Sequence, residues 1–447
     1  MSRFLVTCWP FVGHLYPQIS VARALRERGH EVAFYTHEST RPVVEREGFT
    51  LFPFVHIDDR RYERIHELEA EVPPSQPKYQ TLSVAMKAYR DMLSDSIPEQ
   101  IVDLEPIVRS WRPAVLITDP ALWGPILVAW EYLGVPVALL TQMIGSMIPG
   151  PDAPPWGPGL PPPRSFATRL LSKLAGVAVD LIAYRMRRHV NEIRARYGLG
   201  PMYGSVNAHT GRLPLYLIPS VPELDYNRRD QPANVHYVGP CVWTRPAGEA
   251  PPAWLRELDP KRPWVHATEG TAQYQKPFLL RATARGLAGL PVELILTTGQ
   301  NRDISVLGFD SLPGNVHVAQ WLSHEDFLPH CAALITTGGA ATVLASLQAG
   351  VPMVVVPTFW DKSDNAQRVV EAGVGIRLAP RRATPERLRA AVMRLVEEPH
   401  FSENARQMAR RFREAQGPPR AAELLERLAQ GSPQASAAPR GLSVGTV

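Results

Sequence analysis

Cysteine is scarce in this chain, whose 447 residues include only Cys8, Cys241 and Cys331. The three thiols lie far apart in the sequence, are odd in number and form no Cys-x-x-Cys pair. This pattern indicates neither a disulfide framework nor a structural zinc site. We therefore predict a protein of a reducing compartment, the cytoplasm, with no bound metal.

Long apolar segments and blocks of one charge sign are also missing. The N-terminal MSRFLVTCWPFVGHLYP has an apolar run too short for a signal peptide or membrane span, and Pro10, Gly13 and Pro17 interrupt it. We expect a first β-strand there and no stable membrane insertion. The net charge of +5 comes from scattered arginines, not from a basic block interleaved with aromatic residues, so nucleic-acid binding is not expected.

The length of the chain and its 45% hydrophobic residues exceed what one core usually holds, which favours two domains. Strand-like runs alternate with helical patterns in both halves. They include FLVTC, EVAFYT, VLITD and VPVALL early, and WVHAT, VELILTT, ALITT and VPMVVVP late. Such alternation predicts parallel sheets covered by helices. The predicted fold class is α/β, with two doubly wound, Rossmann-like domains.

A stretch rich in proline and glycine begins at Gly239 and has little periodic pattern, as expected of an interdomain linker. We predict a first domain over residues 1–240, a linker over residues 241–262 and a second domain over residues 263–430. A disordered tail is expected over residues 431–447. The charged residues 57–80 and the proline-rich residues 149–164 are expected as surface insertions that could shape a ligand entrance.

His14 follows the first expected strand, and Asp119 follows the fourth. In a doubly wound sheet of order 3-2-1-4-5, strands one and four are neighbours at the point where ligands bind, so the two side chains could meet. An imidazole oriented by a carboxylate can act as a general base toward an alcohol or a phenol. A histidine after glycine is also typical of a loop or cap, and Asp119 before Pro120 would equally suit a helix N-cap, alone or in addition.

In the second half, an apolar strand over residues 333–336 runs into Gly338 and Gly339 and then into an amphipathic helix. Such a joint points backbone N–H groups and a positive helix end at an anion. Thr337 and Thr342 would add hydroxyl groups. We predict that a diphosphate binds at this helix end.

The segment ATEGTAQ repeats this arrangement at the first strand of the second half, so Gly270 and Thr271 are predicted to face the same phosphates. Two such strand ends together favour a nucleotide site. The chain contains no Asp-x-Asp motif, which argues against a metal-held diphosphate. Helix ends and hydroxyl groups would neutralise the phosphates instead, without a cofactor.

Trp321 follows a short strand, where its indole could stack on a nucleobase; a core or domain-contact tryptophan is the alternative. Asp361, Lys362 and Asp364 follow the run VPMVVVP, again at the carboxyl end of a strand. Their polar groups could bind sugar hydroxyls, although a helix-capping aspartate explains the position equally well.

These motifs together resemble the GT-B glycosyltransferases of the UDP-glycosyltransferase type, particularly the bacterial branch that glycosylates macrolides and other natural products. The resemblance covers nearly the whole chain. It rests on Gly13-His14 and Asp119 in the first half, and on QWLSHEDFLPHC, TTGGAATVLASLQAGVPMVVVP and WDKSDNAQRV in the second. It implies two domains facing each other across a cleft, with His14 as the catalytic base and Asp119 as its partner.

The same resemblance implies roles in the donor site. Trp321 is expected to stack on the nucleobase, Gly339 and Thr342 to contact the diphosphate, and Asp361 to bind hydroxyls of the donor sugar. His324 is expected beside them, in place of a glutamine of the family.

Other donor positions depart from the family pattern. Thr337 stands where the family usually has histidine, and a hydroxyl replaces only part of a charge-assisted contact to phosphate. Ala345 stands where plant members place a glutamate on the ribose. Lys362 replaces a common glutamine and would place a cation near the sugar or the diphosphate. The sugar and the nucleotide, UDP or dTDP, therefore stay open.

We expect a metal-independent, inverting hexosyltransferase that moves a sugar from a nucleoside diphosphate donor to a hydroxyl of a hydrophobic small-molecule acceptor. Phe11, Trp123 and Met143 could line an apolar acceptor pocket, although each is equally plausible as core. One alternative is a noncatalytic GT-B partner protein that assists another transferase, which Thr337 and Ala345 favour slightly. Another is a nucleotide-sugar epimerase or hydrolase of related architecture. Oligomeric state is not predicted.

Overall fold

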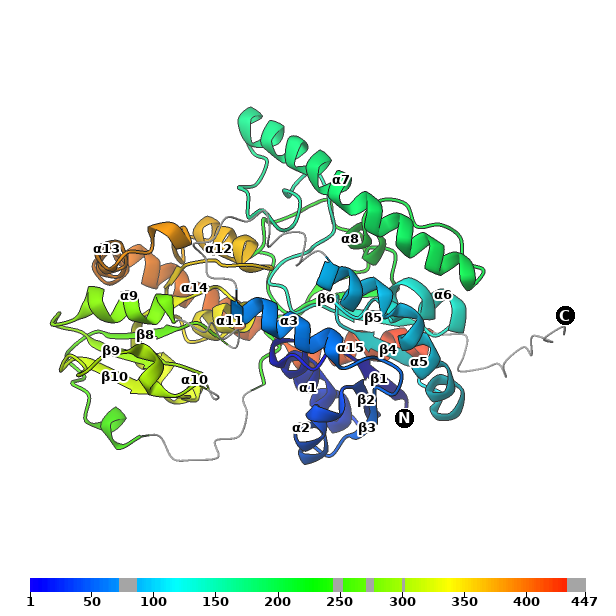
Figure 1. The fold of residues 1–447 in the computed structure, drawn as a ribbon, viewed down its shortest axis with the longest axis horizontal. Helices are drawn as coiled ribbons and strands as arrows, with labels where there is room; N and C mark the ends of the chain where they lie inside the picture. Colours follow the sequence, from blue (N-terminus) through cyan, green and yellow to red (C-terminus); the bar gives the residue numbers. More distant parts are fainter. Residues whose placement is uncertain (72–86, 244–251, 271–276, 300–301, 432–447) are drawn as a thin grey trace, which may run out of the picture.

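The computed structural model describes residues 1–71, 87–243, 252–270, 277–299 and 302–431. Within this part of the chain, two parallel β-sheets lie side by side, each covered by helices (Figure 1). The predicted fold class, two doubly wound α/β domains, is confirmed. The expected positions Thr271 and the tail from residue 432 onward lie outside the described residues.

The first sheet has seven parallel strands in the order β3-β2-β1-β4-β5-β6-β7. In chain order the strands are β1 Arg3–Thr7, β2 Glu31–Thr36, β3 Thr50–Pro53, β4 Val115–Thr118, β5 Val137–Leu140, β6 Leu215–Ile218 and β7 Val235–Tyr237. Phe4 and Val6 join the apolar cluster on one face and Leu5 joins the cluster on the other, as in parallel sheets buried on both faces. Strands β1 and β4 pair directly, so the predicted neighbours at the switch point are confirmed.

The helices of the first half are α1 Val12–Glu27, α2 Arg41–Arg46, α3 Arg60–Glu71, α5 Ile97–Trp111, α6 Trp130–Leu133, α7 Phe166–Arg196 and α8 Val206–Thr210. Single 3₁₀ or π turns occur at Glu38–Thr40, Asp91–Asp95 and Pro125–Ala129. No helix of the described residues combines the length and the apolar character needed to span a bilayer.

The expectation of a surface loop over residues 57–80 is wrong for its first part, which forms helix α3. Ile65 is buried, and the Arg61 guanidinium lies 2.6 Å from the Asp91 carboxylate. One buried apolar side chain and the ion pairs of Arg61 and Arg64 with the next segment thus anchor a highly charged helix. The end of that stretch lies outside the described residues.

The proline-rich residues 149–164 form turns and coil apart from an isolated bridge between Gly150 and Ala153, as the sequence predicted. This insertion reaches the second half of the molecule, because the Gly157 N–H donates to the Asp364 carboxylate at 2.7 Å. It therefore belongs to the contact between the two halves.

The second sheet has six parallel strands in the order β10-β9-β8-β11-β12-β13. The strands are β8 Trp264–Thr268, β9 Glu293–Thr297, β10 Val316–Ala319, β11 Cys331–Thr336, β12 Met353–Val355 and β13 Gly375–Arg377. The helices are α9 Phe278–Leu287, α10 His324–Phe327, α11 Ala340–Gln348, α12 Lys362–Glu371, α13 Pro385–Glu397, α14 Pro399–Glu414 and α15 Pro418–Gln430. Single 3₁₀ turns occur at Ala253–Arg256, Ile304–Leu307, Leu328–His330 and Pro380–Arg382.

The last helix, α15, returns to the first sheet instead of closing the second. Ala421, Leu425 and Ala429 are buried in the same apolar cluster as Phe4, and α15 packs against α1. The Glu426 carboxylate lies 2.6 Å from the guanidinium of Arg28. The predicted second domain, residues 263–430, therefore includes a helix that packs on the first domain. The domain limits otherwise stay a prediction.

A buried ion pair joins the two halves. The Arg368 guanidinium of α12 lies 2.9 Å from the Asp225 carboxylate, and both side chains are almost fully enclosed. The Tyr237 hydroxyl donates to the same carboxylate at 2.6 Å, and the Arg368 guanidinium lies 4.4 Å from the centre of the Tyr226 ring. Such a satisfied network orients two packed layers, because removing either charge leaves the other buried and unpaired.

Candidate active site

His14 and Asp119 meet at the carboxyl edge of the first sheet. His14 lies in the first turn of α1, and its Nδ1 is 3.0 Å from the Asp119 Oδ2. Asp119 is fully buried and directly follows β4. The predicted pairing of these side chains across the switch point is therefore present in the structure, and their roles in a reaction stay a prediction.

The Asp119 carboxylate is held by backbone groups on both oxygens. Its Oδ2 also accepts from the Trp9 N–H at 3.0 Å, and its Oδ1 accepts from the N–H groups of Ala121 and Leu122 at 2.7 and 2.8 Å. The Oδ1 atom thus closes the turn over residues 119–122, while Oδ2 contacts His14. Because the carboxylate cannot reorient without losing these bonds, it presents a fixed acceptor to the imidazole.

The tautomer of His14 follows from this contact. A carboxylate only accepts hydrogen bonds, so the proton resides on Nδ1 and Nε2 keeps its lone pair. The Gln142 side-chain Nε2 lies 2.8 Å from that atom. Gln142 follows β5, the neighbour of β4, and was missed from the sequence although the predicted strand order placed it beside Asp119.

The three expected acceptor residues lie at the same edge of the first sheet and are half-buried. The Phe11 ring lies 5.2 Å from the imidazole of His14, measured between centroids. The Trp123 indole packs on the apolar cluster of this face and donates to the Pro120 carbonyl at 3.0 Å. Met143 follows Gln142 directly. The structure thus gathers apolar groups beside the imidazole, while their contact with a ligand stays a prediction.

The second half contributes an aromatic side chain to the same region. Trp360, just before α12, packs on the apolar cluster of the first domain, and its ring lies 4.5 Å from that of Tyr89. The sequence analysis gave Trp360 no role, although it begins the motif WDKSDNAQRV, because the motif does not show which domain its side chain contacts. The carboxyl edges of the two sheets therefore face one another.

The glycine joint after β11 has the predicted geometry for an anion. Gly338 has φ of +90°, and an added Cβ would lie 2.6 Å from the Val355 side chain, so only glycine fits without a shift. Gly339 is the N-cap of α11, receives no side-chain cap, and has open space where a Cβ would be. Thr342 is half-buried in the first turn. The first amides of a nine-residue helix are thus available to a ligand.

Thr337 directly follows β11, and its predicted contact with phosphate stays a prediction. Its side chain is buried, and its hydroxyl donates to the Glu269 carbonyl at 3.0 Å. The Thr337 hydroxyl would have to give up its hydrogen bond to Glu269 in order to donate one to a phosphate. In this arrangement Thr337 ties the loop after β11 to the loop after β8, where Gly270 has φ of +75° and nothing near its missing Cβ.

Asp361 is linked to the glycine joint through a residue that the sequence analysis missed. The Asn365 side-chain N–H group donates to the Asp361 carboxylate at 2.7 Å and to the Gly338 carbonyl at 2.9 Å. Burial raises the pKa of Asp361, and the Asn365 hydrogen bond and the charges of Lys362 and His14 oppose that rise.

Lys362 and Asp364 flank this carboxylate on α12. The Lys362 ammonium lies 3.2 Å from the Thr358 hydroxyl and 4.5 Å from the centre of the Phe359 ring. Burial raises the pKa of Asp364 to about 6, against the lowering effect of Arg368. Neither residue is thereby placed on a ligand, so the expected sugar contact of Lys362 stays a prediction.

Trp321 and His324 follow β10, at the far end of the same carboxyl edge. Trp321 is 37% exposed, which agrees with a rim position better than with a core one. Burial lowers the pKa of His324 to about 4, so its imidazole is neutral near pH 7 and cannot offer a cation to phosphate. Its ring lies 5.8 Å from that of His266, a buried histidine on β8.

Side chains suited to a metal are not gathered in the described part of the chain, where no group of three or more histidine, cysteine, aspartate or glutamate residues could hold an ion. The arrangement instead offers an oriented imidazole on one sheet edge and uncapped helix amides on the other. Such a pair of edges can remove a proton from one ligand and bind the anionic part of another.

Comparison with known proteins agrees with this geometry. The model of the C-terminal domain of erythromycin biosynthesis protein CIII-like proteins matches residues 283–430. The chain is 34% identical over 406 residues to 4'-demethylrebeccamycin synthase of Lentzea aerocolonigenes, covering 90% of this chain and 94% of that protein. It is 26% identical over 437 residues to demethyllactenocin mycarosyltransferase of Streptomyces fradiae, covering 96% and 87%.

Solved structures share the fold over nearly the whole chain. The glycosyltransferase VinC in complex with dTDP superposes with a TM-score of 0.66 at 23% identity, covering 96% of this chain and 99% of that one. At this identity the likeness concerns the fold.

Proposed function

Because this chain belongs to the GT-B glycosyltransferases of natural-product pathways, we propose that it transfers a sugar, with inversion, from a nucleoside diphosphate to a hydroxyl of a hydrophobic small molecule. The observation that carries the proposal is the contact between His14 and Asp119, opposite the uncapped amides of α11. An oriented base has a use only where a proton must be removed, which argues against a noncatalytic partner protein.

In the proposed reaction, the lone pair on His14 Nε2 takes the proton of the acceptor hydroxyl as its oxygen attacks the anomeric carbon. The bond from that carbon to the diphosphate oxygen breaks in the same step, which inverts the configuration. Asp119 stabilises the imidazolium, and the amides at the start of α11 stabilise the negative charge on the departing diphosphate. No metal or cofactor takes part in this proposal.

The side chain of Gln142 has to be considered in that step. Its N–H group points at the same lone pair that would accept the proton. The acceptor hydroxyl would therefore take the place of this amide on Nε2. Phe11 and Trp360, from the two domains, would supply apolar surface for the aglycone.

The donor is proposed to be a dTDP- or UDP-sugar. The dTDP complex of a structural neighbour supports the first choice. In this proposal, Gly339 and Thr342 bind the diphosphate, Asp361 binds sugar hydroxyls and Trp321 stacks on the base. A thermal-shift titration with dTDP, UDP and GDP would test the nucleotide, since a ligand at about 100 times its Kd stabilises by about 2.7 kcal/mol.

The base is tested with His14→Ala. Turnover is expected to fall by about 10² to 10⁴-fold while dTDP binding is retained, because a general base contributes about that much. His400→Ala is the matched control, since this exposed histidine lies on α14, away from both sheet edges. Unchanged turnover in His14→Ala would overturn the assignment.

The reaction type needs a product measurement. Incubation with donor and a panel of hydrophobic acceptors, followed by NMR of the anomeric proton, is expected to give a glycoside of inverted configuration. Free or isomerised sugar without a glycoside would instead indicate a hydrolase or an epimerase.

A further inference from the structure

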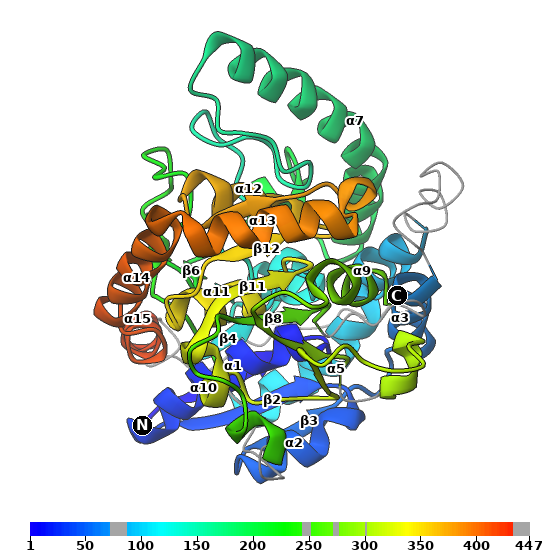
Figure 2. The ribbon, with the colours of Figure 1, turned by 90° about the vertical axis from the view of Figure 1, so that its left-hand side faces the viewer.

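The longest helix of the described residues, α7, has 31 residues and extends outward from the body of the first domain (Figure 1, Figure 2). Eight large apolar side chains are exposed along it. Leu171 and Ile182 lie to one flank, and the other six share one side of the helix: Phe166, Leu170, Leu174, Val177, Leu181 and Tyr184. Their exposed fractions reach 80% for Phe166 and 77% for Leu181. We refer to these six residues as the α7 stripe.

The α7 stripe occupies one side of the helix. From Leu170 to Tyr184 its members recur at alternating steps of about four and three residues, the spacing that places side chains in one helix–helix seam. Ser172, Val179 and Val190 project on the opposite side, where they are half-buried or buried. The helix therefore turns one side to its own domain and the apolar side to the outside.

Such an exposed apolar surface calls for a partner. The stripe is about 27 Å long at 1.5 Å of rise per residue, and contiguous apolar surface of this kind marks interaction sites on soluble proteins. The described residues of this chain leave the stripe uncovered.

We propose that the α7 stripe pairs with the α7 stripe of a second copy of this chain, the two helices running antiparallel about a two-fold axis at Val177. A two-fold interface requires a surface that is complementary to itself. The α7 stripe, the charges beside it and a groove at its end each meet that requirement.

From Leu170 to Tyr184 the α7 stripe is symmetric about Val177. In an antiparallel pair centred there, Leu170 lies opposite Tyr184 of the second copy, and Leu174 lies next to Leu181. Each contact occurs twice, and Val177 meets itself. The side chains from Leu170 to Tyr184 of the stripe are thus buried against apolar side chains of the second copy.

The charges on one flank of the stripe are complementary in the same register. Lys173 precedes Val177 by four residues and Asp180 follows it by three, on the same side of the helix. In an antiparallel pair, a flank meets the same flank of the other helix, so each Lys173 faces Asp180 of the second copy. In a parallel pair this flank would face the opposite flank of the other helix, so Lys173 and Asp180 would not meet.

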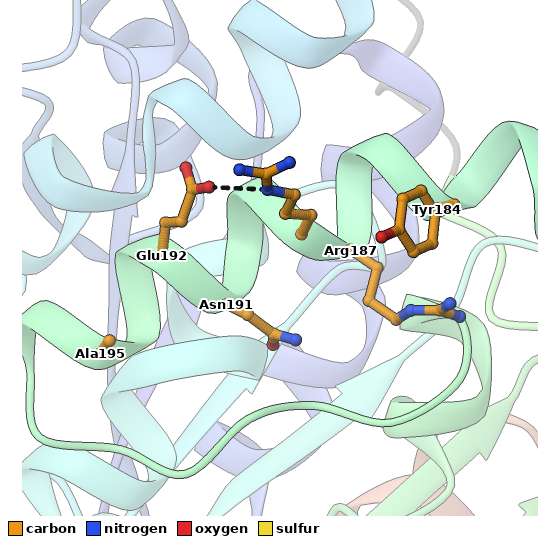
Figure 3. A pocket seen from close by; sticks show the side chains of 6 residues that line it. Tyr184, Arg187, Asn191, Glu192 and Ala195 are labelled. Carbon is orange, nitrogen blue, oxygen red and sulfur yellow. Dashed lines mark hydrogen bonds and ion pairs between the residues drawn. The ribbon is translucent and has the colours of Figure 1, made fainter.

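A groove lies where the end of the stripe would dock. It has a volume of about 450 Å³ and is lined by Tyr184, Arg187, Arg188, Asn191, Glu192 and Ala195, which continue the outward side of α7 (Figure 3). The centred register brings Phe166 of the second copy opposite Arg188. An exposed phenyl ring thus meets a groove that offers a guanidinium and a tyrosine ring, both favourable neighbours for it.

Cysteine cross-linking tests the register. Val177→Cys places two thiols at the two-fold axis, so mild oxidation is expected to give a covalent dimer on a non-reducing gel. Phe166→Cys is the matched control on the same stripe, since the two thiols would lie at opposite ends of the interface and stay unlinked. The native cysteines are all buried and are not expected to interfere. Cross-linking of Phe166→Cys without Val177→Cys would overturn the antiparallel register.

Charge exchange tests the interface in solution. The unmodified chain is expected to sediment as a dimer at micromolar concentration. Lys173→Asp is expected to weaken the dimer at least tenfold, and Lys173→Asp combined with Asp180→Lys to restore it. Both positions are exposed, so thermal unfolding should change little. A chain that stays monomeric at these concentrations would overturn the proposal, and a monomer that binds anionic phosphatidylglycerol vesicles through α7 would assign the stripe to a membrane surface instead.

Discussion

At the carboxyl edge of the first sheet, the functional group is a side chain held by many bonds. Asp119 is buried and accepts from three backbone N–H groups as well as contacting His14. At the corresponding edge of the second sheet, the available groups are backbone amides, and Gly338 and Gly339 keep side chains away from them. In the proposed reaction the first edge removes a proton and the second binds a bulky anion, and these two tasks would call for a fixed carboxylate at one edge and empty space at the other.

Replacing the carboxylate should affect the first edge most strongly. Asp119→Ala is expected to lower turnover by about 10³-fold or more, because the imidazole loses both its tautomer and its orientation. The variant should also unfold more easily, by about 1–3 kcal/mol, since buried N–H groups lose their acceptor. Steady-state kinetics and urea unfolding measure the two effects. Asp119→Asn keeps part of the cap, so it should lose rate with a smaller loss of stability.

A methyl group distinguishes the two glycines of the second edge. Gly338→Ala combines a φ of +90° with a clash at 2.6 Å, so nucleotide affinity is expected to fall by about tenfold or more, at a strain of about 1–3 kcal/mol. Gly339→Ala has room for its methyl group and is the matched control, with a smaller effect. Calorimetric titration with dTDP gives both constants. Equal losses for the two variants would contradict a role for the Gly338 backbone conformation.

The buried carboxylate of Asp364 is expected to make the stability of the protein depend on pH. Its pKa is raised by burial to about 6 from 3.8, so the folded state binds the proton more tightly than the unfolded state. This contribution to stability is present below pH 3.8 and is lost as the pH rises through 6. Asp364→Asn removes this contribution. The stability of the variant relative to the unmodified protein should therefore be higher at pH 7.5 than at pH 4.5, by about 1–2 kcal/mol. Urea unfolding of both proteins at both pH values tests the sign. An equal stability difference between the two proteins at the two pH values would contradict it.

The smallest effect is expected at Gln142. Its amide touches the imidazole that Asp119 already orients, so Gln142→Ala should change turnover by less than about tenfold. The acceptor KM is the more informative reading, because the amide and the acceptor hydroxyl compete for the same lone pair. A loss of about 10³-fold would mean that Gln142, and not Asp119, controls the imidazole.

Much of the first edge could be predicted from the sequence. Alternating strand and helix patterns restrict the chain to doubly wound sheets, and the strand order of such sheets makes β1 and β4 neighbours. His14 and Asp119 therefore had to approach one another once both followed those strands. Gln142 was open to the same inference through β5, but glutamine after a strand has no motif to draw attention to it.

Side-chain hydrogen bonds in the second half were not predictable in the same way. Thr337 donates to the Glu269 carbonyl, and Asn365 joins Asp361 to Gly338. These contacts depend on the positions of loops to within a few tenths of an ångström, whereas the sequence predicts only that the loops lie at the same edge. The helix over residues 60–71 was missed because its highly charged sequence is held by contacts made elsewhere in the chain.

The sequence by itself determined the two parallel sheets, the edge at which functional residues gather and the glycine joint of α11, because these depend on local periodicity and on general rules of strand connection. Only the tertiary structure decided that α15 crosses to the first sheet, that Arg368 meets Asp225, and that α7 keeps its apolar side outside. Packing between distant segments selects among patterns that are locally equivalent. An apolar helix face has the same sequence signature whether it covers its own domain or is left for a partner.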